Sequence, residues 1–170
     1  MTMQPEQFKN DPLAKIFAFM SKKYVGVASK KLSKLDLKRY YYALLIIEDE
    51  QPEITQQMLA EMMKIDKVSV FRMVDYFCKN DILERKVNIE DRRSQYLYLT
   101  AKGRKITPQI RKVYKEVNAI AFEGISKSDR EIFFEVLAKI HANLDAEPNM
   151  EVKVDLKELG AAKPRKILLT

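Results

Sequence analysis

Two short helical segments separated by three residues constrain the fold of this chain more than any other feature. Thr55 is a favourable N-cap for the segment QQMLAEMM, and Asp66 is a favourable N-cap for KVSVFRMVDYFCKN. Between them lies KID, the length of the tight turn in a helix-turn-helix. From Leu83 to Thr100 the helical period gives way to β-branched and aromatic alternation, which predicts a two-stranded hairpin. In this order the elements predict a winged helix-turn-helix, mostly α with a small β wing.

The second of these helices is expected to have two faces. Its apolar face repeats at helical spacing and is predicted to be core, with Val70, Met73, Val74 and Phe77. Its other face presents the candidate DNA-binding residues Lys67, Val68, Ser69, Phe71, Arg72 and Tyr76. Most of them lie in the N-terminal half, which is the part of a recognition helix that enters a major groove. There Arg72 could donate two parallel hydrogen bonds to a guanine. Val68 and Phe71 either contact thymine methyl groups or pack against the neighbouring helix.

The positive charge of the chain is concentrated around these segments. Fourteen basic and seven acidic residues lie between Glu61 and Lys115, so this segment carries the whole net charge of +7. The charges of the remaining residues balance. Such a concentration favours a polyanionic partner, nucleic acid first, over a solvated charged face.

Helical patterns also precede the two segments. A helix that opens at Asp11-Pro12 is expected to fade between Gly26 and Ser29, and another is expected to start at Asp36 and end before Pro52. The first carries an apolar stripe of Leu13, Phe17, Met20 and Tyr24, and the second one of Leu37, Tyr41, Leu44 and Leu45.

Two further helices are expected after the hairpin. Thr100 is predicted to cap the first of them, and Pro108 to kink it or disturb its first turns. The capping-box match SDRE, residues 128–131, is predicted to open the second. The apolar stripe of this last helix comprises Phe133, Val136, Leu137, Ile140 and Leu144.

The chain resembles the MarR family of bacterial transcriptional regulators between Ile54 and Gly103. Asp91-Arg92-Arg93, followed by Leu-Thr-Ala-Lys-Gly at residues 99–103, is similar to the D-x-R and L-T-x-x-G wing signature of that family. IDKVSVFRMVDYF is similar to its recognition helix in length and apolar spacing. The resemblance implies a homodimer formed by the terminal helices, with two recognition helices in successive major grooves over an inverted repeat. The expected organisation is an N-terminal arm and dimerisation helix (1–35), a winged helix-turn-helix DNA-binding lobe (36–100), C-terminal dimerisation helices (101–147) and a tail of unassigned role (148–170).

The resemblance also assigns roles within the wing. Asp91 is the expected brace of the hairpin, Arg93 is the expected minor-groove contact, and Arg92 is expected to add a phosphate contact. Arginine suits a narrow minor groove because its guanidinium is weakly hydrated and the groove potential is strongly negative. A simple surface ion pair is the alternative interpretation. Many members have a glycine after the recognition helix; here Asn80 is expected to adopt the left-handed conformation that ends it.

Regulation by a small aromatic acid is a further implication of the resemblance. Five aromatic residues either contribute to an effector pocket or pack in the core: Phe17, Tyr24, Tyr40, Tyr41 and Tyr42. Cys78, the single cysteine, is interpreted as a packing residue, and His141 has no cysteine or histidine partner in the sequence.

The sequence therefore predicts a sequence-specific DNA-binding regulator, a repressor, that binds operator DNA as a homodimer. A winged helix used for protein–protein contact is the alternative. No phosphate loop, zinc-binding motif or nucleophile motif indicates an enzyme, and no cofactor or metal is expected. One cysteine, the lack of a signal peptide in MTMQPEQFKN and the lack of a long apolar run predict a soluble cytoplasmic protein with no membrane partner.

Overall fold

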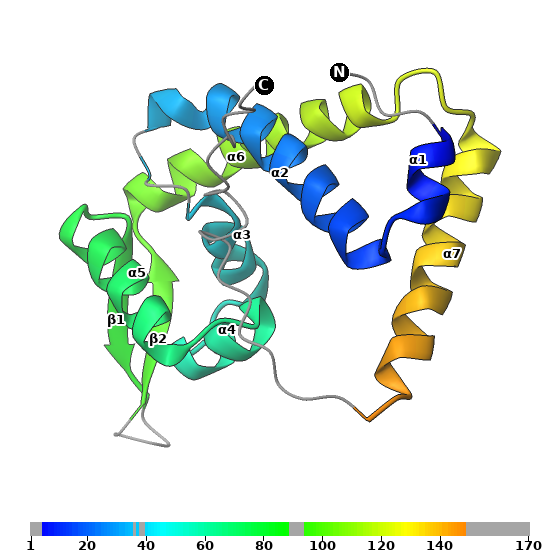
Figure 1. Ribbon diagram of the computed structural model, residues 1–170. Coiled ribbons are helices and arrows are strands. Elements are labelled where there is room, and N and C mark those ends of the chain that lie inside the picture. The colour runs from blue at the N-terminus through cyan, green and yellow to red at the C-terminus, as the bar shows by residue number, and fades with distance from the viewer. Residues whose placement is uncertain (1–4, 36, 38–39, 89–93, 149–170) are drawn as a thin grey trace, which may run out of the picture. The chain divides into compact units, whose positions relative to one another are not determined.

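The computed structural model describes residues 5–35, 37, 40–88 and 94–148, and the chain divides into two compact units between Arg39 and Tyr40 (Figure 1). Asp91, Arg92 and Arg93 lie outside the described residues, as does the tail from residue 149. No helix in the described part of the chain is both long enough and apolar enough to span a bilayer.

The first unit contains a short helix, a long helix and a single 3₁₀ turn: α1 (Pro5–Asn10), α2 (Leu13–Leu32) and η1 (Ser33–Leu35). The expectation that α2 fades between Gly26 and Ser29 is wrong, because the helix continues to Leu32. Gly26 faces open space, so it weakens the helix by its low propensity alone. A glycine in a helix interior destabilises it by about 1 kcal/mol relative to alanine, which is too little to end a helix of 20 residues.

The second unit contains five helices and the hairpin. The helices are α3 (Tyr41–Glu50), α4 (Gln56–Met63), α5 (Lys67–Lys79), α6 (Ala101–Ala121) and α7 (Lys127–Asp145). The bounds of α4 and the caps of α4, α5 and α6 are those predicted, because Thr55, Asp66 and Thr100 each accept a hydrogen bond from a backbone N–H of the first turn. These three caps are local signals, which explains why the sequence identifies them.

Two predicted helix starts are wrong. Helix α3 begins at Tyr41 rather than Asp36, and its residues 43–47 are all buried, so the apolar run and not a capping residue determines its position. Helix α7 is capped by Ser126 rather than Ser128. The Ser126 hydroxyl accepts from the backbone N–H of Asp129 at 3.1 Å and donates to its carboxylate at 2.6 Å. Pro108 lies within α6, which is assigned as one continuous helix from Ala101 to Ala121.

The hairpin pairs β1 (Leu83–Val87) with β2 (Gln95–Leu99) in antiparallel register, Arg85 opposite Leu97. A third segment extends this sheet, since the backbone N–H of Leu97 donates to the carbonyl of Ile54 at 2.8 Å and Thr55 forms a bridge with Tyr96. Leu97 and Leu99 are fully buried, whereas Tyr96 and Tyr98 on the opposite face are partly exposed. The sheet therefore presents one apolar face to the helices.

The core of the second unit gathers side chains from α3, α4, α5, the hairpin and α6. Its largest fully buried members are Leu44, Ile47, Ile54, Leu59, Val70, Met73, Phe77, Ile82, Leu97, Leu99 and Ile110. The four apolar positions predicted for the recognition helix all have zero exposure. The predicted core face of α5 is confirmed.

Candidate nucleic-acid interface

Helices α4 and α5 are joined by a turn whose geometry is fixed by hydrogen bonds. Lys64 adopts the left-handed conformation with φ 53°. Its N–H donates to Glu61 O at 3.2 Å, and the N–H of Ile65 donates to Ala60 O at 3.2 Å, which together form a Schellman motif. The chain then enters α5 at the Asp66 cap. The end of α4 and the start of α5 are therefore held in a defined relation to each other.

The N-terminal half of α5 is exposed on the face opposite the core. Lys67, Val68, Ser69, Phe71 and Arg72 are exposed, and the apolar members Val68 and Phe71 are exposed by 59% and 56%. Neither is buried against a neighbouring helix, which was the alternative interpretation of these two residues. Tyr76 differs from the other candidates. Its ring is half-buried and lies 5.8 Å from that of Phe77 and 6.3 Å from that of Tyr40, so part of its surface packs within the second unit.

Asp66 places a carboxylate at this otherwise positive surface. It accepts from the Ser69 backbone N–H at 2.9 Å and from the Ser69 hydroxyl at 2.7 Å. The hydrogen bond from the Ser69 side chain, followed by that from its backbone, lowers the pKa of Asp66 below its ordinary value of 3.8. The carboxylate therefore stays ionised and its lone pairs are directed to the helix terminus.

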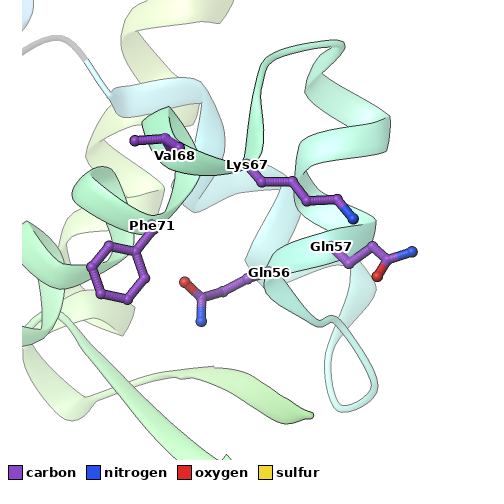
Figure 2. A pocket seen from close by; sticks show the side chains of 5 residues that line it. All are labelled: Gln56, Gln57, Lys67, Val68 and Phe71. Carbon is purple, nitrogen blue, oxygen red and sulfur yellow. The ribbon is translucent and has the colours of Figure 1, made fainter. Parts of the chain in front are cut away.

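A shallow groove of about 410 Å³ lies between the N-terminal turns of α4 and α5. Gln56 and Gln57 line it from α4, and Lys67, Val68 and Phe71 line it from α5 (Figure 2). Figure 2 shows the Gln56 amide extending toward the Phe71 ring, whereas Lys67 and Gln57 extend together toward the other side. The sequence did not indicate Gln56 or Gln57, because the two sides of the groove come from different helices.

Phe71 also contacts the hairpin. The guanidinium carbon of Arg85 lies 5.8 Å from the centre of the Phe71 ring, which is within the range of a cation–π contact. The Nε and Nη2 atoms of Arg85 are buried and have no hydrogen-bond partner. The same holds for the Oε1 atom of Gln56. These are the three buried side-chain polar atoms without a partner in the described part of the chain.

The Leu-Thr-Ala-Lys-Gly segment joins the end of α5 to the start of α6. The Thr100 hydroxyl caps α6 by accepting from Gly103 N–H at 3.1 Å, and it donates to the carbonyl of Asp81 at 2.7 Å. The Lys102 ammonium donates to the carbonyl of Asn80 at 2.8 Å. A Cβ atom on Gly103 would overlap the carbonyl oxygen of Ile82, so the absence of a side chain at this glycine permits the close approach of the two segments.

The left-handed residue after α5 is Asp81, with φ 57°, and not Asn80 as predicted. Asn80 has φ −98°, and its side-chain amide donates to the carbonyl of Tyr76 at 2.7 Å. Asp81 N–H then donates to Cys78 O and Ile82 N–H donates to Phe77 O. This is a second Schellman motif, in which the amide of Asn80 satisfies one more carbonyl of the helix.

The described part of the wing carries cationic and aromatic side chains. The Lys86 ammonium lies 4.5 Å from the centre of the Tyr98 ring and 3.0 Å from the Glu84 carboxylate. The predicted roles of Asp91, Arg92 and Arg93 stay predictions, because these residues fall within the segment that is not described.

Some of the positive charge counted in the sequence is already neutralised. Arg111 of α6 donates through Nε to Glu48 at 2.8 Å and through Nη2 to Asp49, and the Thr107 hydroxyl donates to the other oxygen of Glu48. The hydrogen bond to Glu48, then that to Asp49, raises the pKa of Arg111. This network joins α3 to α6, so Arg111 is a structural cation rather than a free one.

The five aromatic residues considered for an effector pocket are divided between the units. Phe17 and Tyr24 belong to the first unit, and the other three belong to the second. Tyr41 is buried, the Tyr40 ring lies 6.1 Å from that of Phe77, and Tyr42 is exposed. Tyr40 and Tyr41 thus contribute to packing in the second unit.

Cys78 and His141 show no arrangement for chemistry. Burial raises the pKa of the Cys78 thiol, and Asp75 adds to this effect while Arg85 opposes it, which favours the unreactive protonated form. His141 is exposed on α7. The described residues include no group of three or more histidine, cysteine or acidic side chains suited to hold a metal ion.

Comparison with known proteins connects this geometry to a family. Residues 41–95, from the start of α3 to the start of β2, match the sequence model of the MarR family. Within these residues the chain is similar to the MarR family. The chain is 24% identical over 136 residues to the HTH-type transcriptional regulator YybA of Bacillus subtilis, covering 80% of this chain and 90% of that protein.

Solved structures share the fold of this chain. A MarR-family transcriptional regulator from Listeria monocytogenes, complexed with a 26-mer DNA, has a TM-score of 0.69 and 23% identity over 79% of this chain and 89% of that one. The MepR–DNA complex of Staphylococcus aureus has a TM-score of 0.73 and 18% identity over 79% of this chain and 99% of that one.

Proposed function

We propose that this protein binds operator DNA as a homodimer, with α5 as the recognition helix and the wing in the adjacent minor groove. One observation carries the proposal. The four apolar positions of α5 are fully buried, while Lys67, Val68, Ser69, Phe71 and Arg72 form an exposed surface on its N-terminal half. A recognition helix requires this division, because it must be held by its core face while its N-terminal half reaches base edges. Two structurally similar proteins bound to DNA support the same assignment.

Exposed apolar side chains support the homodimer. No residue of α7 is buried in the described chain, and Ile132, Phe133, Phe134, Val136 and Leu144 are all exposed. At the corner between α6 and α7 the rings of Phe122, Phe133 and Phe134 lie 5.4 to 5.8 Å from one another. Helix α2 exposes Leu13, Phe17, Phe19 and Met20. Apolar surface on this scale favours an interface with a second copy.

The finer regulatory proposal is repression with release by a small aromatic acid. The partly exposed Tyr40 ring contacts both Tyr76 and Phe77 of α5. A ligand that moved Tyr40 would therefore act on the recognition helix directly. Repression is expected because a dimer seated on an inverted repeat excludes other proteins from the same DNA.

Salt dependence tests the DNA-binding proposal against the protein-contact alternative. The full chain is titrated with generic duplex DNA at several salt concentrations. A DNA reader should lose affinity with a log–log slope of roughly −0.9 per neutralised phosphate. Undetectable duplex binding at low salt would favour a module for protein–protein contact. Selection of bound fragments from the source genome would then give the half-site and its spacing, expected at about 10 bp between centres.

The homodimer has its own test. Sedimentation should give a dimer for the full chain, and removal of residues 1–30 should give a weak or unstable DNA binder. A truncated protein that stays folded and binds operator DNA tightly would overturn the proposed role of the N-terminal helix.

A further inference from the structure

The groove between α4 and α5 has a composition unlike that of an ordinary phosphate-binding surface. Its apolar lining residues are Val68 and Phe71, both more than half exposed. Two exposed apolar side chains of this size, adjacent on the helix that carries the positive charge, have no role in contacting phosphates. They suit a polyanionic ligand that also carries an exposed apolar group.

We infer that this groove holds the C5 methyl group of a thymine in each operator half-site, and that Phe71 and Val68 thereby determine a position of sequence specificity. The inference rests on the proposed function and deepens it. In the major groove of B-DNA, thymine alone among the four bases presents a methyl group, which apolar side chains read by contact. Removing that methyl from water against Val68 and Phe71 stabilises the complex without any hydrogen bond.

Charge around the groove favours DNA as its occupant. Lys67 lines the groove, and Lys64 and Arg72 are exposed on the adjoining turn and helix. The two helix N-termini add positive potential. Asp66 is the acid nearest in sequence, and its carboxylate is occupied by Ser69. Glu61 also lies beside the groove, because its carboxylate accepts a hydrogen bond from Gln57 at 3.1 Å. The three cations Lys64, Lys67 and Arg72 thus outnumber these two acids, as the approach of a phosphate backbone requires.

Polar atoms beside the groove are consistent with an A·T base pair. The amide of Gln56 extends toward Phe71. Its Oε1 is buried and lacks a donor, so pairing with a base requires this side chain to rotate outward. A bound adenine presents its N6 amino group in the major groove on the same base pair as the thymine methyl, and a glutamine amide is suited to pair with it. On the other side of Phe71, the Arg85 guanidinium lies 5.8 Å from the ring centre. We assign Arg85 as a positioning residue for the ring.

Removal of a single methyl group from the DNA tests the inference without altering the protein. Each thymine of a selected operator is replaced in turn by deoxyuridine, which lacks the C5 methyl group, and affinity is measured by fluorescence anisotropy. One thymine per half-site should show a loss of about fourfold, and replacement in both half-sites a loss of about fifteenfold. Uniform affinity at every thymine would overturn the inference, whereas the DNA-binding proposal would stand.

Protein variants locate the effect. Phe71→Ala and Val68→Ala should bind the thymine and deoxyuridine operators with nearly equal affinity, while keeping the salt dependence of the parent protein. Met62→Ala is the matched control, because Met62 is a similarly exposed apolar residue of α4 that does not line the groove. Discrimination that persists in the Phe71→Ala and Val68→Ala variants would overturn the inference. Absence of duplex binding by the parent protein would overturn both proposals.

Discussion

The backbone of Gly103 is so close to Ile82 that a Cβ atom at position 103 would overlap the carbonyl oxygen of Ile82, and it would lie 2.9 Å from the Leu99 side chain. Helix α6 therefore starts in direct contact with the backbone that follows α5. This contact explains why the segment before α6 requires a glycine at this position.

Gly103→Ala should consequently destabilise the second unit. The added methyl group meets a backbone carbonyl that cannot move without disturbing the Schellman turn, so a loss of about 1–3 kcal/mol is expected. Chemical denaturation measures it. Gly26→Ala is the matched control, because nothing lies within 4 Å of the position where its Cβ would be. This second variant should be neutral or more stable by up to about 1 kcal/mol, and equal destabilisation of both variants would contradict the contact.

Asp66→Asn should change how stability depends on pH. The folded pKa of Asp66 lies below its ordinary value of 3.8, so the carboxylate stabilises the folded state above that value. The contribution is lost as the pH falls through the folded pKa. Asparagine caps a helix about as well but does not titrate, so the stability difference between parent and variant should narrow below about pH 4. Urea denaturation at a series of pH values measures this, with Glu123→Gln as a control for the change of one charge. Parallel pH profiles for the parent and Asp66→Asn would contradict the assignment.

Arg111→Ala should lower the melting temperature modestly without preventing folding. The variant removes hydrogen bonds to Glu48 and Asp49 across the α3–α6 contact. Because Arg111 is largely exposed, the expected loss is about 1 kcal/mol, and it should shrink at high salt. Lys112→Ala, one residue along α6 and exposed, should have little effect. A loss independent of salt would show that packing rather than charge carries the contribution.

Arg72→Ala tests base reading by the recognition helix, given the proposed function. Loss of a bidentate contact to guanine should cost about 1–3 kcal/mol of operator affinity and should relax the preference at one base position. Binding to generic DNA should fall less. Lys105→Ala, which removes an exposed cation from α6, should weaken operator and generic binding alike. Equal losses on both kinds of DNA for Arg72→Ala would show a phosphate contact instead.

The elements that the sequence predicts well are those whose signals are local. Thr55, Asp66 and Thr100 each cap the helix that follows them, and the buried positions of α5 follow directly from its apolar period. The sequence does not determine which residue caps α7. Ser126 and Ser128 each precede an acidic residue by three positions, and a capping signature alone does not choose between them.

The site features that the sequence does not reveal depend on residues distant along the chain. Arg111 is indistinguishable in sequence from a free cation, yet its partners lie more than sixty positions earlier. Lys102 likewise appears as surface charge until its ammonium is seen against the carbonyl of Asn80. The groove next to Phe71 requires two helices to meet at a turn in which Lys64 is left-handed. Periodicity and capping rules describe one element at a time, so they cannot identify such contacts.

Thr100 and Lys102 attach the C-terminal end of α5 to the first turn of α6. A tilt of α6 would therefore move the end of α5 with it. A helix of 21 residues is about 31 Å long. A tilt of about 5° around its far end would displace its attached end by about 3 Å. That distance is close to the rise of a single base-pair step, 3.4 Å in B-DNA. In the proposed homodimer, a slight tilt of α6 in each protomer would thus be enough to move the recognition helices out of register with their half-sites.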